Sequence, residues 1–162
     1  MQTTREEARK ESKENLVGNL QGLLEKNYDA EKGFRNALNN ANNEQLKSFL
    51  KKQAEQRNRF ATELDNELRA LNKKPKENGS ATGAIHRTWI DFKSSIAGNN
   101  DEAVLEECIR GEKASEKEYR NSLKENHFPP KVENVLNKHL NEIQTTLSQV
   151  RTLENLAERN DL

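Results

Sequence analysis

Hydrophobic residues recur along the chain at alternating steps of three and four positions in four long stretches. These stretches lie over 16–41, 44–72, 101–126 and 130–156. Side chains three or four positions apart lie on one face of an α-helix, so each stretch predicts an amphipathic helix with one buried seam. Only three prolines and seven glycines occur, and the stretches are rich in residues that favour helix.

The links between these predicted helices differ in length. NNANN at 39–43 and HFPP at 127–130 are short, so each predicts an antiparallel hairpin. The link at 73–100 is long, because a loop over 73–82 is followed by a short amphipathic helix over 83–97. The apolar face of this short helix carries Ile85, Trp89, Phe92 and Ile96.

A link of this length can return the chain to the end of the bundle where the second helix began. The second and third helices would then be parallel, which is the one-crossover arrangement of ferritin-like bundles. The alternative is a long loop that lies across one end of the bundle. We expect the crossover, with Trp89 and Phe92 buried against the long helices.

The predicted fold is therefore all-α, a ferritin-like four-helix bundle with one long crossover that carries a short extra helix. The bundle occupies residues 16–159 and its crossover occupies 73–100. Residues 1–15 are charged and almost without apolar side chains. They predict either a flexible arm or a solvated extension of the first helix.

Composition and charge exclude several classes of protein. The 162 residues have a mean hydropathy of −1.13 and balance 27 basic against 27 acidic side chains. No stretch approaches the roughly 20 apolar residues of a membrane span, and the N-terminus has no apolar signal region. A neutral chain lacks the positive field that favours nucleic acid. We expect a cytoplasmic protein without nucleic-acid or membrane partners, in which the lone Cys108 is a buried hydrophobe.

Motifs of the common enzyme families are absent from the sequence. It contains no GxxxxGK[ST], GxGxxG, GxSxG, HExxH or CxxC. No catalytic set of residues can be assigned from the spacing. The sequence leaves open whether the protein is an enzyme and favours a non-catalytic one.

Polar residues interrupt each hydrophobic seam near its middle. They are Asn27 and Glu31 in the first helix, Gln53, Gln56 and Arg57 in the second, Glu112 and Ser115 in the third, and His139 in the fourth. In an antiparallel hairpin, residues equally far from the turn lie at the same height along the bundle. By this count, from turns near 42 and 128, the polar positions fall at similar heights. The sequence therefore predicts one polar layer at the middle of the bundle.

This layer has two interpretations. In the first, Asn27, Gln53, Gln56 and Arg57 form a structural network in which Arg57 pairs with Glu31 or Glu112, and Glu31 is the partner expected from its level. In the second, Glu31, Glu112 and His139 hold iron or manganese.

The sequence favours the structural network, because the di-iron pattern of ferritin-like bundles fails in detail. That pattern needs a Glu-x-x-His motif on two helices. The second helix has Gln53-Ala-Glu-Gln56 instead, and the fourth has His139 before Glu142, in the reverse order. A neutral amide cannot offset the charge of a metal ion, so no cofactor is expected.

Three segments carry a resemblance to a known family. They are LLEKNYDAEKGFRNA (23–37), GAIHRTWIDFKSSIAG (83–98) and DEAVLEECIRGEKASEKEY (101–119). In this order and spacing they resemble the bacterial family called domain of unknown function 2383, whose members are ferritin-like four-helix bundles. The resemblance implies the fold and no established reaction. Ferritin-like relatives store iron, activate oxygen or resist stress, but those roles depend on the carboxylate and histidine ligands.

The sequence thus supports two hypotheses about function. The first is a non-catalytic interaction or structural module, related to stress, that forms a homodimer or binds a protein partner through a face of the bundle. The alternative is a di-iron-like redox or storage protein. Nucleic-acid binding is the least supported idea, because basic and acidic residues are interspersed throughout the chain.

Overall fold

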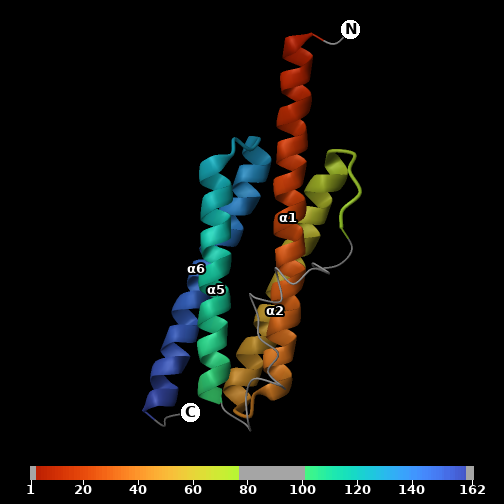
Figure 1. Cartoon of the computed structure of the whole chain (residues 1–162). Helices are drawn as coiled ribbons and strands as arrows, with labels where there is room; N and C mark the ends of the chain where they lie inside the picture. The colour runs from red at the N-terminus through yellow and green to blue at the C-terminus, as the bar shows by residue number, and fades with distance from the viewer. Residues whose placement is uncertain (1–2, 77–100, 160–162) are drawn as a thin grey trace.

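The computed structural model describes residues 3–76 and 101–159, which form four long helices (Figure 1). These helices are α1 (Thr4–Asn40), α2 (Glu44–Ala70), α5 (Asp101–Glu125) and α6 (Pro130–Glu158). Their bounds follow the stretches expected from hydrophobic spacing, apart from the start of α1. The short helix predicted over 83–97, with Trp89 and Phe92, lies outside the described residues.

Helix α1 begins well before Leu16, the first residue of its hydrophobic seam, and a capping box closes its first turn. Thr3 Oγ1 accepts a hydrogen bond from the Glu6 amide at 3.2 Å, and the Glu6 carboxylate accepts one from the Thr3 amide at 2.8 Å. Residues 3–15 are exposed. Figure 1 shows this part of α1 extending beyond the ends of the other helices. The charged segment is therefore a solvated extension of α1 from Thr4 onward.

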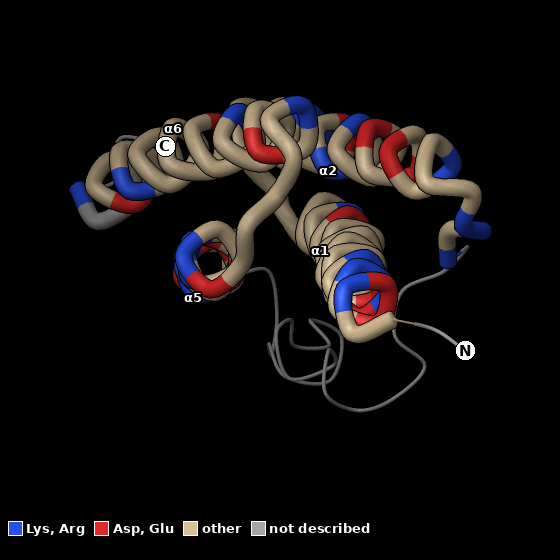
Figure 2. Tube along the Cα trace, turned by 90° about the horizontal axis from the view of Figure 1, so that it is seen from above, with Lys and Arg blue, Asp and Glu red and all other residues tan. Residues whose placement is uncertain are grey.

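The four helices form two antiparallel hairpins. Residues 41–43 link α1 to α2, and Asn43 caps α2 by accepting a hydrogen bond from the Leu46 amide at 3.0 Å. Residues 126–129 link α5 to α6, whose first residue is Pro130. The hairpins pack together with α1 beside α5 and α2 beside α6. Figure 2 shows this arrangement from above, with both acidic and basic residues visible on each of the four helices.

Helices α2 and α5 run in the same direction. Asp101, the first residue of α5, accepts hydrogen bonds from the backbone amides of Asn42 and Asn43, which precede α2. Lys74 and Lys76 lie at the other end of α2 and hydrogen-bond the side chain of Gln21. The end of α2 and the start of α5 are thus at opposite ends of the bundle (Figure 1), which confirms the ferritin-like topology.

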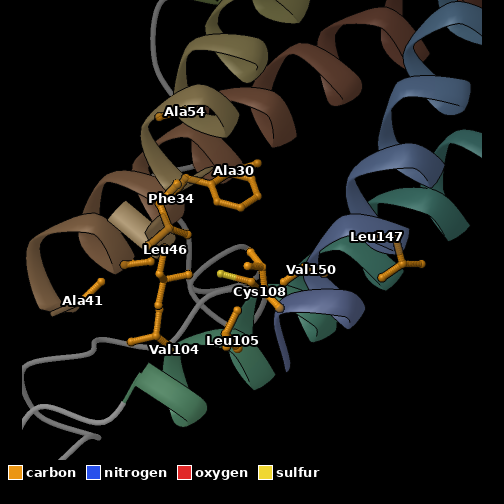
Figure 3. Packing of buried hydrophobic residues seen from close by; sticks show 13 residues of the cluster. Ala30, Phe34, Ala41, Leu46, Ala54, Val104, Leu105, Cys108, Leu147 and Val150 are labelled. Atoms are coloured by element: carbon orange, nitrogen blue, oxygen red, sulfur yellow. The ribbon is translucent and has the colours of Figure 1, made fainter. Parts of the chain in front are cut away.

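The hydrophobic core consists of two clusters that lie one after the other along the bundle. The first cluster includes Phe34, Leu46, Leu105, Cys108 and Val150, and lies toward the α1–α2 turn (Figure 3). The second includes Leu24, Phe60, Leu64, Tyr119 and Leu136. On α1, α2 and α5, buried polar residues lie in the chain between the members of these two clusters.

Candidate functional site: a buried polar layer

A layer of buried polar side chains lies where the two hydrophobic clusters meet. All four helices contribute to it, and its central members are Asn27 (0% exposed), Arg57 (1%), Glu112 (0%) and His139 (0%). This layer occupies the interruptions of the hydrophobic seams. Buried polar groups of this kind are stable only when they hydrogen-bond one another.

Arg57 of α2 joins the layer to α1 and α5. Its Nη1 donates to Asn27 Oδ1 at 3.0 Å, and its Nη2 donates to Glu112 Oε1 at 2.5 Å. The guanidinium also lies 5.7 Å from the centre of the Phe60 ring. Among the described residues, Arg57 Nε and Glu112 Oε2 have no hydrogen-bond partner. The pair is therefore a desolvated ion pair whose members depend strongly on each other.

A second chain of hydrogen bonds continues from Asn27 toward α6. Asn27 Nδ2 donates to the hydroxyl oxygen of Tyr119 and to the carbonyl oxygen of Leu23, both at 2.8 Å. The Tyr119 hydroxyl lies 3.0 Å from Nδ1 of His139. These contacts connect Arg57 to His139 through two neutral side chains.

His139 connects this network to the surface of the bundle. Its Nε2 lies 2.7 Å from Oε2 of Glu63, whose side chain is 27% exposed. Glu63 pairs with Arg59 at 3.3 Å, and Arg59 also pairs with Glu142 at 2.6 Å. The His139 ring stacks on Phe60 with 4.0 Å between the ring centres. One face of the imidazole is therefore packed against an apolar ring, and its Nε2 edge hydrogen-bonds a carboxylate at the bundle surface.

Burial controls the protonation of these groups. It lowers the pKa of His139 to about 4, although Glu63 opposes the shift, so the imidazole is neutral at pH 7. Burial also raises the pKa of Tyr119. It raises the pKa of the Glu112 carboxyl, and Arg57 limits that rise. Partial burial acts to raise the pKa of Glu63, but the hydrogen bond with His139 and the charges around it, including Arg59, together outweigh burial, and the pKa is lowered overall.

The two predicted glutamines belong to a separate part of the layer. The Thr146 hydroxyl donates to Gln53 Oε1 at 2.8 Å and lies 3.3 Å from Gln56 Oε1. These contacts join α2 to α6. These hydrogen bonds involve only uncharged groups, and among the described residues they do not extend to Arg57.

The expected pairing of Arg57 with Glu31 is wrong. Glu31 accepts hydrogen bonds from Arg35, with Nη2 at 2.8 Å, and from Asn58, on the outside of the bundle. The buried seam of α1 steps from Asn27 to Ala30, which is 1% exposed, rather than to Glu31. A three-residue step at this point turns Glu31 onto the flank of the helix.

The three candidate metal ligands are not brought together as a set. Glu31 pairs with Arg35, Glu112 pairs with Arg57, and His139 contacts Tyr119 and Glu63. Within residues 3–76 and 101–159, no group of three or more His, Cys, Asp or Glu side chains is arranged to hold a metal ion.

Sequence spacing does not single out two members of the network, Tyr119 and Glu63. Tyr119 lies on the α5 seam among apolar residues, yet a buried phenol needs a hydrogen-bond partner, and this requirement points to a polar neighbour. Glu63 lies beside Leu64 at the edge of the α2 seam, and nothing in its spacing marks it. Cys108 is fully buried, as expected of a small hydrophobe, and burial raises the pKa of its thiol.

The class of protein follows from the helices and from their comparison with solved structures. The fold matches a point mutant of Mycobacterium smegmatis Dps1 with a TM-score of 0.75 and 21% sequence identity, over 89% of this chain and 97% of that one. It matches the tetragonal form of Mycobacterium smegmatis Dps with a TM-score of 0.74 and 20% identity, over 88% of both chains. The protein has a ferritin-like four-helix bundle.

Residues 15–125 match the model of the family described as domain of unknown function 2383, and the chain belongs to this family. The matched region includes most of α1 and all of α2 and α5. No curated protein sequence matches the chain. None of the described helices combines the length and the hydropathy needed to cross a lipid bilayer.

Proposed function

We propose that this protein is a non-catalytic helical module that acts through its surface and carries a fixed cation, Arg57, in place of a metal centre. The observation that supports this is the Arg57–Glu112 pair in the buried layer, with Nη2 2.5 Å from Oε1. A stress-related role is the setting that the ferritin-like fold suggests.

The residues of the layer do not fit a di-metal group. Such a centre needs several carboxylates and two imidazoles to balance and cap its cations. Glu112 already neutralises the Arg57 guanidinium. A metal ion that took Glu112 as its ligand would leave the guanidinium uncompensated and would meet its positive charge at short range. Gln53 and Gln56 offer only neutral oxygens. The layer is thus built around the permanent charge of Arg57, which Glu112 neutralises.

Metal analysis tests this part of the proposal. Protein purified without chelator is incubated with Fe(II) or Mn(II), passed through a desalting column and analysed for bound metal. We expect no stoichiometric metal in the wild-type protein. Stoichiometric iron or manganese that is lost in both Glu112→Gln and Glu31→Gln would overturn the proposal and support the di-iron-like alternative.

A groove between the start of α2 and the end of α6 is the surface we propose for partner binding. Phe49 and Leu156 are half-buried there, Leu153 forms part of its wall, and Lys52 is the one charged residue among the nine that line it. The chain as a whole is 33% charged. Depletion of charge with an aromatic residue present is typical of interface centres.

A second copy of this chain is the partner we propose for the groove. With Lys52 as its one charged residue, the groove offers little complementarity to a charged partner, whereas a two-fold contact places the same groove on both sides of the interface. Burial of Phe49 and Leu156 against their counterparts would remove apolar surface from water on both subunits.

Light scattering after size exclusion tests this proposal. We expect a dimer for the wild-type protein and a monomer for Phe49→Glu, because a buried carboxylate at the interface is strongly unfavourable. Ile109→Glu is the matched control, since Ile109 is a half-buried aliphatic residue on α5. A monomeric wild-type protein at high concentration would contradict the proposal, as would a dimer of Phe49→Glu that is as stable as the control.

A further inference from the structure

Tyr119, His139 and Glu63 form a continuous hydrogen-bonded path from the core to the surface. Tyr119 is 2% exposed and its hydroxyl lies 3.0 Å from Nδ1 of His139. Nε2 of the same ring lies 2.7 Å from the carboxylate of Glu63, which is partly exposed. The three side chains come from α5, α6 and α2, so the path crosses between the two hairpins.

The partners of each atom fix the direction of the hydrogen bonds. Asn27 Nδ2 donates to the Tyr119 oxygen at 2.8 Å, which leaves the phenol proton to be donated to His139. Nδ1 of His139 is then the acceptor, and Nε2 carries the ring proton and donates it to Glu63. The neutral imidazole therefore has an acceptor facing a phenol and a donor facing a carboxylate, as a proton shuttle requires.

This arrangement addresses the main obstacle to one-electron oxidation of a buried phenol. Removal of an electron alone leaves a charged radical in a site shielded from water, and prior loss of the proton is opposed because burial raises the pKa of Tyr119. A base hydrogen-bonded to the phenol lets the proton leave as the electron leaves, so no net charge develops on the ring. An electron can tunnel through a short thickness of packed protein, whereas a proton needs the hydrogen-bonded path.

We propose that Tyr119 is a one-electron donor whose oxidation is coupled to proton transfer through His139 to Glu63. A diffusible radical oxidant outside the bundle takes one electron from Tyr119. The phenol O–H bond breaks and its proton forms an N–H bond at Nδ1, while the proton on Nε2 moves to the Glu63 carboxylate. The products are a neutral tyrosyl radical, a neutral imidazole in its other tautomer, a neutral Glu63 carboxyl group and an oxidant reduced by one electron.

This activity is independent of the proposed partner binding. It needs no metal, and it gives the buried network a role in intercepting oxidising radicals. Tyr28, the second tyrosine of the chain, is half-buried in α1 and serves as an internal comparison.

The experiment uses the azide radical, generated by pulse radiolysis, as the one-electron oxidant of the full chain. Time-resolved absorption and freeze-quench electron paramagnetic resonance report the tyrosyl radical. We expect a long-lived radical in the wild-type protein and in Tyr28→Phe, and its loss in Tyr119→Phe. In D₂O the radical should form more slowly, because a proton moves in the same step.

Two further variants separate proton transfer from structure. Glu63→Gln keeps an oxygen that accepts the Nε2 hydrogen bond but is not basic, so the radical should form more slowly while the fold is unchanged. His139→Gln should slow formation by about a hundredfold, the low end of what a positioned general base contributes. A radical located on Tyr28 or Trp89, or wild-type rates in a folded Glu63→Gln, would overturn the proposal.

Discussion

The carboxylate of Asp101 accepts a hydrogen bond from the backbone amide of Asn43 at 3.0 Å, although 58 residues separate the two in sequence. Asn43 is the N-cap of α2 and Asp101 is the first residue of α5. The contact therefore holds the starts of two parallel helices together. It also places a negative charge beside two helix N-termini, where the partial positive charges of both helices favour it.

Asp101→Ala should lower the free energy of unfolding by about 1 kcal/mol, because two backbone amides lose their acceptor. Urea denaturation followed by circular dichroism measures the change. Glu102→Ala is the matched control, since Glu102 is an exposed acidic residue in the same first turn. Equal losses in the two variants would contradict a specific role for Asp101.

Arg57→Met should destabilise the bundle by about 3–5 kcal/mol, because it leaves the buried Glu112 carboxylate without its cation. The double variant Arg57→Met/Glu112→Leu should be more stable than Arg57→Met, since it removes both charges. Denaturation of these proteins and of Glu112→Leu gives the coupling energy directly. The control is Arg35→Met at the exposed pair with Glu31, where we expect a change of about 0–1 kcal/mol. Additive effects at positions 57 and 112 would show that the pair does not act as a unit.

Stability should fall as the pH is lowered from 6.5 toward 4. His139 has a pKa of about 4 in the folded bundle against an ordinary value of 6.5, so in this window the unfolded chain binds a proton that the folded chain does not. The loss of unfolding free energy should reach about 2–3 kcal/mol at the acid end. Glu63 adds a further loss of stability below pH 4.5, its ordinary pKa, because its pKa is lowered in the folded bundle.

Denaturation midpoints measured across this range test the assignment in wild type and in His139→Gln. The variant should lose the slope between pH 6.5 and 4. Glu112 contributes with the opposite sign, because its pKa is raised, and that contribution should persist in both proteins. An unchanged slope in His139→Gln would show that another group is responsible.

Deletion of residues 1–14 should change the free energy of unfolding of the bundle by less than about 0.5 kcal/mol, because the side chains of residues 3–14 are exposed and belong to neither core cluster. The helical circular dichroism signal should fall with the lost turns. Deletion through Leu20, which is fully buried, serves as the contrasting case and should destabilise the protein. A large loss from the shorter deletion would mean that the extension packs on the bundle.

Sequence spacing predicts the hairpins and the level of the polar layer, because short turns fix the register of the helices they join. Reflection through residue 42 brings position 31 level with 53 and position 27 level with 57, so it does not favour the expected Arg57–Glu31 pair. The structure has the hydrogen bond between Asn27 and Arg57. The ion-pair partner of Arg57 in the other hairpin, Glu112, is predicted less well. The register between α2 and α5 depends on how the two hairpins pack, which no turn specifies.

The position of Glu31 escapes prediction for a different reason. Seams of three and four residues can continue from Asn27 to Ala30 or to Glu31, and both choices return to Phe34. Packing selects the small apolar Ala30, which is buried, and leaves Glu31 on the flank. The Tyr119–His139–Glu63 path depends on side-chain directions from three helices, and one-dimensional spacing does not contain that information.

The Arg57 pair also constrains how the family can diverge. Substitution of Arg57 alone leaves an unpaired carboxylate in the core, and substitution of Glu112 alone leaves an unpaired guanidinium. Each single substitution therefore gives a destabilised protein. Positions 27, 57 and 112, on three different helices, are therefore expected to be inherited as a set and to be exchanged together. A family member with apolar residues at all three positions would no longer have this constraint. Sequence comparison within the family would then show correlated substitutions at positions that are far apart in the chain.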